Sequence, residues 1–374
     1  MLFQKLGLPM RFGLIGCGWI VERDHIPAMR QSDEVEIVAT ADVAPERARL
    51  AARIAGVPEG AAYSDYRALL ERGDVDIVSV ATPPTTRPQI VRDAAAAGKH
   101  IVCEKPFALS LAAADGMIAA CQAAGVTLAI YHNYLYYYEH RLAAELIAAG
   151  KIGDVVATEI CGLGSRPWMG AEQFRPGWRL IPALAGGGVI MDIGVHSFYL
   201  TELMHAEPAR SVTAQMRFAE SGVDDHAYCQ LALGGATGLV NIAWGEGTAR
   251  FEIDGTAGYI SYVYDEGAGY FGSSVRAVRV GSVEGPTVTH HVPPGRTQFT
   301  PAIFADLVDT ITGERSAFRS FGPDGRRALE IALAAYQSVA DGAPAVLPLG
   351  PGQPVYSAGA APLLESRKAS AYAG

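Results

Sequence analysis

Two glycines near the start of the chain have the spacing of a phosphate-binding turn. Gly16-Cys17-Gly18 follows a short apolar run and precedes a predicted helix. Glycines in this context permit a tight turn, and they let backbone N–H groups and the helix N-terminus face a pyrophosphate. Val21 stands where a complete G-x-G-x-x-G motif has its third glycine, so an ordinary strand-to-helix turn is the alternative. We predict a dinucleotide site here that also includes Trp19 and Ile20.

Asp42 ends the second predicted strand. A carboxylate at this place can accept hydrogen bonds from the hydroxyls of an adenosine ribose, and it repels a 2′-phosphate. Val43, Ala44 and Pro45 follow, without an Arg or Ser that could receive such a phosphate. We therefore predict NAD as the cofactor in preference to NADP. The alternative interpretation of Asp42 is a helix cap ahead of Pro45.

These residues need a parallel sheet to position them. From Arg11 to about Tyr131, short apolar runs alternate with alanine-rich helical segments. Strands that are buried on both faces read as continuous apolar runs, and the helices between them imply right-handed parallel crossovers. We predict a doubly wound α/β domain, a Rossmann fold, over residues 1–131, with strands in the runs RFGLIG, VEIVATAD, VDIVSVATP, KHIVCEKP and VTLAIYHN.

The sequence pattern changes after Asn133. One predicted helix, near residues 140–149, is followed by glycine-separated runs in which apolar and polar residues alternate. Such runs are typical of half-buried strands in a mainly antiparallel sheet. Two predicted helices, near residues 302–312 and 325–340, precede a Pro-, Gly- and Ala-rich tail from Gly342 that we expect to be irregular. We predict a second, α+β domain over residues 132–374.

Several further motifs carry a resemblance to a known family. Beside the glycine turn with His25 downstream, the chain contains Ala81-Thr82-Pro83, Glu104-Lys105-Pro106, and the run GGGVIMDIGVH from Gly186 to His196. This set resembles the glucose-fructose oxidoreductase / inositol dehydrogenase (Gfo/Idh/MocA) family. The stretch FGPDGRRALEIALAAYQSVADGAPAVLPL is similar to the closing helix of that family, so the resemblance spans nearly the whole chain. The E-K-P and D-x-G-x-H motifs are its specific part.

The resemblance implies a Rossmann domain followed by an open-faced, mainly antiparallel sheet. It also implies NAD(P)-dependent, reversible oxidation of a secondary hydroxyl in a sugar, sugar derivative or cyclitol, with Lys105, Asp192 and His196 as the catalytic group. A carbinol that loses hydride must also lose its hydroxyl proton, and a neutral imidazole with an ordinary pKa of about 6.5 suits that task. His196 is the predicted general base. Lys105 would stabilise developing alkoxide charge, and Asp192 would orient substrate or base.

The remaining predicted contacts divide between cofactor and substrate. Thr82 and Pro83 follow a strand and are expected to border the nicotinamide, and the resemblance suggests that Arg179 binds substrate hydroxyls. The predicted cofactor contacts are Gly16, Cys17, Gly18, Trp19, Ile20, Asp42, Ala81, Thr82, Pro83, Glu104, Lys105 and Asn133. The predicted substrate contacts are Lys105, Asn133, Trp178, Arg179, Asp192 and His196.

The chain departs from the family pattern in two places. Pro84 and Arg87 stand where the family commonly has Asn and His, and the tyrosine-rich run Tyr131–Tyr138 stands where it often has Asn-x-Arg-Phe. Loss of that Arg suggests a site less suited to an anionic substrate. The tyrosines could stack on a pyranose ring or pack between the domains. The family also implies a cis Lys105-Pro106 peptide bond.

Each catalytic candidate has an alternative interpretation. Asp192 could cap the following helix, Lys105 could be a solvated lysine, and His196 could be a hydrogen-bonded core histidine. Two other functions are also open: a glycosidase or lyase that oxidises one carbon transiently with tightly held NAD, and a non-catalytic nucleotide-sensing protein. The three residues together argue against the last, because a pure binder needs no proton acceptor beside a nicotinamide.

Composition excludes several other classes of protein. The 374 residues carry 30 Lys and Arg against 39 Asp and Glu, a net charge of −9, so we expect neither nucleic-acid nor membrane partners. We find no secretory signal and no run of about 18 apolar residues. Five widely spaced cysteines predict a reduced, cytoplasmic chain, and we expect no metal site at His290-His291 or Asp224-Asp225-His226. Exposed apolar strand faces predict a homodimer or homotetramer.

Overall fold

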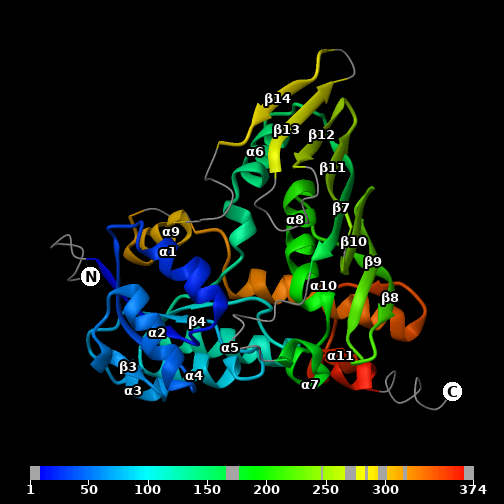
Figure 1. Cartoon of the computed structure of the whole chain (residues 1–374). Helices are drawn as coiled ribbons and strands as arrows, with labels where there is room; N and C mark the ends of the chain where they lie inside the picture. Colours follow the sequence, from blue (N-terminus) through cyan, green and yellow to red (C-terminus); the bar gives the residue numbers. More distant parts are fainter. Residues whose placement is uncertain are drawn as a thin grey trace.

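The computed structural model describes residues 9–165, 177–245, 247–265, 275–282, 285–293, 301–314 and 318–365. These residues form a six-stranded and a nine-stranded sheet. Figure 1 shows the smaller sheet with its helices as one lobe and the larger sheet standing beside it, with helices between the two. The predicted fold class, a Rossmann domain followed by a mainly antiparallel sheet domain, is confirmed.

The six-stranded sheet is parallel throughout. Its central strands are buried on both faces, which explains their continuous apolar runs. The chain order reverses between β1 and β4, and ligands of such sheets bind beyond the carboxyl ends of the strands at this point. Across the sheet the strands are β3 (Ala62–Tyr63), β2 (Val35–Ala41), β1 (Met10–Ile15), β4 (Ile77–Val80), β5 (His100–Cys103) and β6 (Leu128–Ile130).

Two helices of this domain begin and end at residue types that favour helix ends. In the second helix Pro45 occupies the first turn, and Gly56 ends it in the left-handed conformation with φ 78°. In the fifth helix Ser110 is the N-cap and its hydroxyl accepts a hydrogen bond from the N–H of Ala113. The helices are α1 (Ile26–Met29), α2 (Pro45–Ala55), α3 (Tyr66–Leu70), α4 (Arg87–Ala96) and α5 (Leu111–Ala124).

The nine-stranded sheet forms the second domain. All its pairings are antiparallel except that of β10 with β7. Along β9, Cys229 and Leu231 are buried while Tyr228 and Gln230 are exposed, the alternation expected of a sheet with one covered face. The strands are β14 (Val288–His291), β13 (Val275–Ser282), β12 (Gly258–Tyr264), β11 (Ala249–Gly255), β7 (Val155–Ser165), β10 (Ala236–Trp244), β9 (Asp224–Leu233), β8 (Ser211–Phe218) and β15 (Ala345–Val346).

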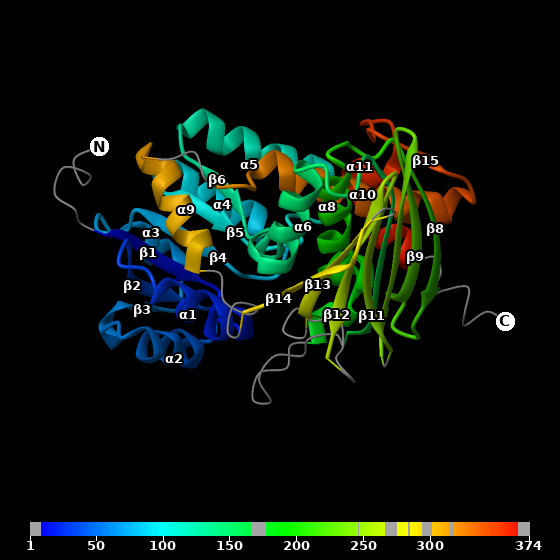
Figure 2. The same ribbon diagram turned by 90° about the horizontal axis from the view of Figure 1, so that it is seen from above.

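Three helices cover the inner face of this sheet. These are α6 (Tyr138–Ala148), α8 (Val195–His205) and α10 (Gly322–Asp341), and Figure 2 shows them between the two sheets. Among the described residues, the apolar stretch Pro182–His205, which begins with α7 (Pro182–Ala185), is long enough to cross a membrane. Because 78% of its most apolar window is buried inside the protein, it serves as a core segment.

One helix from the C-terminal part of the chain, α9 (Pro301–Thr312), packs away from the second sheet. This helix follows strand β14 of the second sheet in the chain, yet it packs on the first domain beside α1 (Figure 1). The ring of Phe304 lies 5.7 Å from that of Phe12 and 5.5 Å from that of Tyr131. The apolar stripe that it shares with Leu307 therefore completes the core of the Rossmann domain rather than that of the second domain.

The tail after Gly342 is more regular than expected. β15 pairs with β8, and a short helix, α11 (Pro354–Ala358), follows. Ala345, Leu347 and Leu349 are buried at every second position. This period of two places one side of the segment in the core. Because proline and glycine are abundant in this segment, the alternation of buried and exposed residues was not evident from the sequence.

Candidate active site

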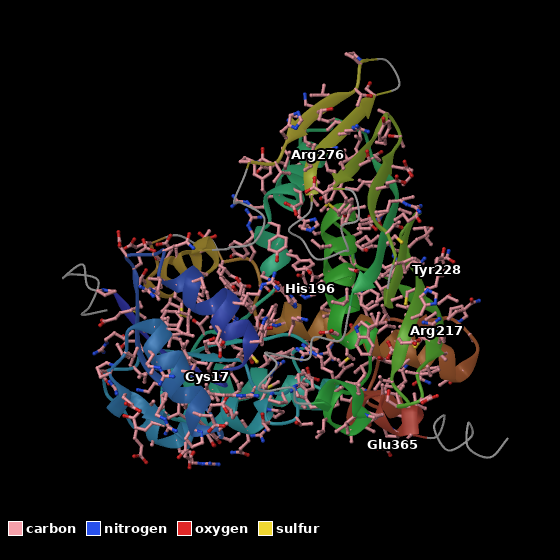
Figure 3. The ribbon with its side chains drawn as sticks, in the orientation of Figure 1. Cys17, His196, Arg217, Tyr228, Arg276 and Glu365 are labelled. Carbon is pink, nitrogen blue, oxygen red and sulfur yellow. The ribbon has the colours of Figure 1, made fainter. Side chains whose placement is uncertain are left out.

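A cavity of about 910 Å³ lies between the carboxyl edge of the parallel sheet and the second domain. Figure 3 shows His196 at this junction and Cys17 on the Rossmann side. Every residue predicted for the cofactor or the substrate lines this cavity: Gly16, Cys17, Gly18, Trp19, Ile20, Asp42, Ala81, Thr82, Pro83, Glu104, Lys105, Asn133, Trp178, Arg179, Asp192 and His196.

The glycine turn is shaped for close approach of the backbone to a ligand. Gly16 has φ 87°, and a Cβ there would lie 2.8 Å from the amide nitrogen of Thr82 and 2.9 Å from the carbonyl carbon of Ala81. A Cβ at Gly18 would meet no atom within 4 Å, so open space lies in front of this second glycine. A turn of this kind, followed by a helix, fits the pyrophosphate of a dinucleotide.

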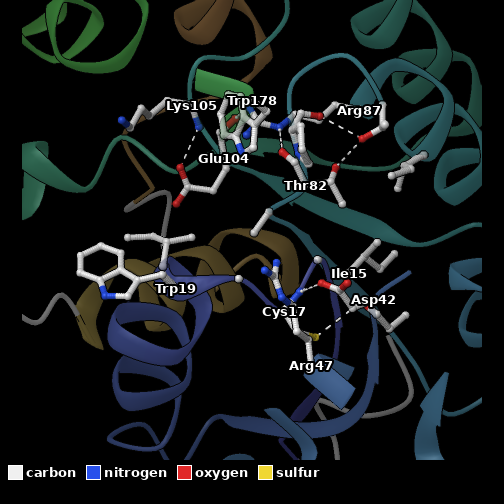
Figure 4. Close-up of a pocket in the computed structure, with 18 of the residues that line it drawn as sticks. Ile15, Cys17, Trp19, Asp42, Arg47, Thr82, Arg87, Glu104, Lys105 and Trp178 are labelled. Carbon is white, nitrogen blue, oxygen red and sulfur yellow. Dashed lines mark hydrogen bonds between the residues drawn. The ribbon is translucent and has the colours of Figure 1, made fainter. Parts of the chain in front are cut away.

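Asp42 ties the end of β2 to the glycine turn. Its Oδ2 accepts a hydrogen bond of 2.8 Å from the N–H of Cys17 (Figure 4), and its Oδ1 accepts one of 2.9 Å from the N–H of Ala44. The N-cap of α2 is Ala44, without a side-chain cap, so Asp42 is not a helix cap. The sequence reasoning missed Arg47, which lines the same end of the cavity from the first turn of α2.

Arg87 holds together the loops that follow β4 and β5. Its buried guanidinium donates hydrogen bonds to the carbonyl oxygens of Thr82 (2.8 Å), Glu104 (2.6 Å) and Pro106. Burial lowers the pKa of Arg87. The Lys105-Pro106 peptide bond in this loop is cis, as the resemblance implied. Arg87, which stands where the family commonly has histidine, thus connects the two loops through hydrogen bonds. The sequence did not reveal this role.

Glu104 is a buried anchor for the backbone of Lys105. Its Oε1 lies 3.0 Å from Nε2 of His25, and its Oε2 accepts a 2.9 Å hydrogen bond from the N–H of Lys105. Nδ1 of His25 lies 2.9 Å from the hydroxyl of Ser79. Burial alone would raise the pKa of Glu104, but the hydrogen bond to His25 and the charges of Lys105 and Arg87 bring it below its usual value. Glu104 is therefore an ionised carboxylate that positions Lys105.

Asp192 sits between two cations from different parts of the chain. Nζ of Lys105 donates a 2.7 Å hydrogen bond to the carbonyl oxygen of Asp192 and lies 3.4 Å from its Oδ1, while Nε of Arg179 lies 3.6 Å from the same Oδ1. Oδ2 of Asp192 is buried and has no hydrogen-bond partner among the described residues. Lys105 is thus not a free surface lysine, and Asp192 has one carboxylate oxygen that the described residues leave unsatisfied.

His196 lies on α8 and is buried, with only 3% of its surface exposed. Its Nδ1 is 2.6 Å from the hydroxyl of Tyr199, and its ring stacks on that of Tyr134 with centroids 4.1 Å apart. Burial, reinforced by the positive charge of Lys105, holds the pKa of His196 well below its ordinary 6.5. The imidazole is therefore neutral at neutral pH, and its Nε2 is available to accept a proton.

A buried carboxylate fixes the glycine run that leads to Asp192. The side chain of Asp224, on β9, accepts hydrogen bonds from the N–H groups of Gly188 (2.6 Å) and Ile190 (2.8 Å) and from the hydroxyl of Tyr336. A Cβ at Gly188 would lie 1.8 Å from the carbonyl oxygen of Asp224, so only glycine fits. Asp192 itself lies on a π-helical turn, Ile190–Gly194, a feature often found at functional sites.

The tyrosines of the run Tyr131–Tyr138 form packing contacts. Tyr134 stacks on His196 on one side and on Tyr137 on the other, with centroids 4.1 Å and 4.7 Å apart. Tyr131 packs 4.2 Å from the ring of His25. The faces of Tyr134 are thus used within the protein, which favours interdomain packing over stacking on a sugar ring for this residue.

The described residues contain no group of three or more His, Cys, Asp or Glu arranged to hold a metal ion. Nε2 of His226 instead lies 2.9 Å from Oδ1 of Asn241. Asp225 pairs with Arg217 at 2.8 Å. His226 and Asp225 are thus engaged with side chains other than metal-ligand neighbours.

Comparisons with known proteins match family models to both parts of the chain. The model described as "Oxidoreductase family, NAD-binding Rossmann fold" matches residues 10–132, and the "GFO/IDH/MocA C-terminal domain" matches residues 140–261. The chain belongs to the Gfo/Idh/MocA oxidoreductase family. The two matched regions contain the glycine turn, the E-K-P motif and the D-x-G-x-H motif.

Individual members of the family resemble the chain at moderate identity. D-apiose dehydrogenase of Paraburkholderia graminis is 30% identical over 259 residues, which cover 66% of this chain and 65% of that protein. 1,5-Anhydro-D-fructose reductase of Ensifer adhaerens is 33% identical over 218 residues, 58% of this chain and 63% of that protein. These matches span less than two thirds of the relatives' own length. The crystal structure of aldose-aldose oxidoreductase from Caulobacter crescentus, complexed with glycerol, superposes with a TM-score of 0.79 at 27% identity, covering 91% of this chain and 100% of that chain.

Proposed function

We propose that this protein is an NAD(P)-dependent oxidoreductase that reversibly oxidises a secondary hydroxyl of a sugar, sugar derivative or cyclitol by hydride transfer. One observation carries the proposal. The neutral imidazole of His196, the ammonium of Lys105 and the acceptor oxygen of Asp192 line the same cavity as the glycine turn and Asp42. A proton acceptor and a stabilising cation thus share one cavity with a nucleotide-binding turn.

The Rossmann end of the cavity would hold the cofactor. The N–H groups of Gly16-Cys17-Gly18 would face its pyrophosphate, and Asp42 would accept hydrogen bonds from the adenosine ribose. NAD is the preferred form because Asp42 repels a 2′-phosphate. When bound, the nicotinamide cofactor accepts the hydride that leaves the carbinol carbon.

The residues at the other end would manage the proton and the developing charge. Nε2 of His196 takes the hydroxyl proton, because Nδ1 is engaged with Tyr199. Nζ of Lys105 stabilises negative charge on the same oxygen. Oδ2 of Asp192 accepts a hydrogen bond from a substrate hydroxyl, and Arg179 and Trp178, which line this end, contact the sugar.

The relatives support sugars as the substrate class. Their names specify a D-apiose dehydrogenase, a 1,5-anhydro-D-fructose reductase and a D-xylose 1-dehydrogenase. A neutral polyol also suits a site that has lost the arginine often present after the last Rossmann strand. We therefore expect neutral sugars or cyclitols to be better substrates than sugar acids.

We also propose that the protein forms a homodimer or homotetramer through the outer face of its second sheet. In the described part of the chain no helix covers this face (Figure 2), and Tyr228 on it is 41% exposed. Light scattering after gel filtration should give a multiple of the chain mass, and Tyr228→Lys should weaken the assembly. A monomeric wild type would contradict this proposal.

The cysteines fit a reducing compartment such as the cytoplasm. All five are buried and unpaired with one another. Burial raises the pKa of Cys103 to about 12, so its thiol is unreactive. We propose that the protein works in the cytoplasm without disulfides.

An absorbance assay for NADH tests the proposed function. The wild-type protein is supplied with NAD or NADP and with a panel of aldoses, 1,5-anhydrosugars, inositols and sugar acids. We expect NADH to accumulate with at least one neutral sugar or cyclitol. If neither cofactor is reduced by any member of the panel, the proposal is wrong. Release of a cleaved product without NADH would instead indicate transient oxidation.

A further inference from the structure

Asp24 is an acidic residue that the predicted site did not include. It lies one residue before His25 on the π-helical turn Val21–His25, it is 6% exposed, and it lines the cavity. Its Oδ1 is buried, and no donor in the described part of the chain bonds to it. The carboxylate is held by hydrogen bonds from the side chains of Asn133, whose Nδ2 is 3.4 Å from Oδ2, and of Tyr131.

The neighbours of Asp24 place it near the reacting end of the cavity rather than the adenosine end. Nδ2 of Asn133 also lies 3.4 Å from the hydroxyl of Tyr137. Tyr137 stacks on Tyr134, which stacks on His196. A continuous set of contacts thus leads from the carboxylate of Asp24 to the proposed base. Asp42, at the adenosine end, is not part of this set.

A buried carboxylate oxygen without a donor is costly, and folded proteins keep few of them. In the described lining of the cavity two carboxylate oxygens have this property, Oδ1 of Asp24 and Oδ2 of Asp192. They come from different domains. A ligand with donors at two separate positions would satisfy both, and a polyhydroxylated ring or chain carries such donors.

We propose that Oδ1 of Asp24 accepts a hydrogen bond from a substrate hydroxyl other than the one that is oxidised, so that Asp24 is a specificity-determining residue for neutral polyols. This inference rests on the proposed function and adds a substrate class to it. Asn133 and Tyr131 position the carboxylate. A carboxylate on the substrate at this position would be repelled, which excludes sugar acids bound in that orientation.

The substitutions Asp24→Ala and Asp24→Asn separate the hydrogen bond from the fold. Asp24→Ala removes the acceptor. Asp24→Asn keeps the shape of the side chain. Its amide oxygen would accept the hydrogen bond from Asn133, so its NH₂ group, a donor instead of an acceptor, would face the cavity. The control is Asp33→Asn, an exposed acidic residue in the turn before β2. Binding of NADH to each variant is measured by fluorescence, so that damage to the cofactor site is seen separately.

The readout is discrimination between a sugar and its deoxy analogues. The wild type is assayed with the best substrate of the sugar panel and with each monodeoxy derivative of it. We expect loss of one particular hydroxyl, not the oxidised one, to lower kcat/KM about tenfold or more in the wild type. In Asp24→Ala the parent sugar should show a similar loss through a raised KM, and removal of that hydroxyl should have no further effect. Asp24→Asn should give a smaller loss, and Asp33→Asn none.

Three results would overturn the inference. An unchanged KM for the sugar in both Asp24 variants would show that no substrate hydroxyl is bound there. A weaker affinity for NADH with an unchanged sugar KM would assign the oxygen to the nicotinamide carboxamide. A loss that is equal for the parent sugar and every deoxy analogue would indicate a structural role.

The inference can be judged even if the proposed function fails. If the wild type binds NADH but oxidises no member of the panel, binding of myo-inositol to the NADH-loaded protein is measured by NADH fluorescence. Binding that weakens about tenfold in Asp24→Ala supports the hydroxyl site. Equal binding in both proteins, or none in the wild type, contradicts it.

Discussion

The hydroxyl of Tyr199 lies 2.6 Å from Nδ1 of His196, one helical turn earlier on α8. This contact engages Nδ1 of the imidazole, so Nε2 is the ring nitrogen left to act on a substrate. If Nδ1 carries the proton and donates it to the Tyr199 oxygen, Nε2 has a lone pair directed at the substrate. The ring of His132 stacks on that of Tyr199, with centroids 4.2 Å apart, and fixes the orientation of the phenol.

Tyr199→Phe should therefore slow the reaction without lowering the affinity of the protein for its cofactor. Loss of a hydrogen bond that orients His196 should lower kcat by about fivefold, since one such bond contributes about 1 kcal/mol. Affinity for NADH, measured by fluorescence, should stay the same. Tyr259→Phe on the exposed face of the second sheet is the matched control. An unchanged kcat in Tyr199→Phe would show that Tyr199 does not position the base.

Asp42 should set the preference between NAD and NADP. Asp42→Ser removes the charge that opposes a 2′-phosphate, and Arg47, at the same end of the cavity, can then attract that phosphate. We expect the ratio of kcat/KM with NADP to that with NAD to rise at least about tenfold, a change of about 1.4 kcal/mol. Steady-state kinetics with both cofactors measures it. Equal or better use of NADP by the wild type would contradict the assignment.

Arg87 should stabilise the E-K-P loop. A lysine at this position cannot donate simultaneously to the three carbonyl oxygens that the guanidinium reaches, so Arg87→Lys leaves buried acceptors unsatisfied. We expect the free energy of unfolding to fall by about 1.5–3 kcal/mol and kcat to fall with it, because Lys105 is in this loop. Urea denaturation measures the first effect. The exposed Arg92→Lys on the same helix should change neither, and equal stability of both variants would refute this role.

Ionisation of Glu139 should lower the free energy of unfolding as the pH rises. Its carboxyl is fully buried and receives no hydrogen bond from another side chain among the described residues, and burial raises its pKa from 4.5 to about 7. Between these two values the folded state holds a proton that the unfolded state has lost, so this group's contribution to stability falls as pH rises through the window. From pH 5 to pH 8 the wild type should lose about 1–3 kcal/mol relative to Glu139→Gln, at about 1.4 kcal/mol per unit of pKa shift.

Urea denaturation at the two pH values gives this difference. Glu145→Gln is the matched control, because Glu145 is exposed on the same helix, α6. It should keep the pH dependence of the wild type. Parallel pH profiles for the wild type and Glu139→Gln would mean that Glu139 is ionised in the folded protein.

The sequence predicted those features that local patterns specify. The glycine turn, the E-K-P motif and the D-x-G-x-H motif each lie within a few residues, and continuous or alternating apolar runs distinguish the two sheets. Asp24 could not be found in this way, because its partner Asn133 is 109 residues away in the chain. The same holds for Phe304, whose packing on Phe12 assigns α9 to the first domain.

Two other features of the site were not predicted because they depend on tertiary contacts. Arg87 was recognised as a departure from the family, but its role depends on carbonyl oxygens from two loops that only the folded sheet brings together. The stacking of Tyr134 between His196 and Tyr137 likewise requires the two domains to be in place. Residue types and spacing identify candidate groups, whereas their partners are set by tertiary contacts.

The turnover of His196→Ala tests the central claim most directly. NADH formation is measured with the best sugar of the panel at saturating concentration, beside NADH affinity and the exposed control His291→Ala. Loss of the general base should lower kcat by about 10²–10⁴-fold, with cofactor affinity nearly unchanged and the control like wild type. Unaltered turnover in His196→Ala would contradict the account.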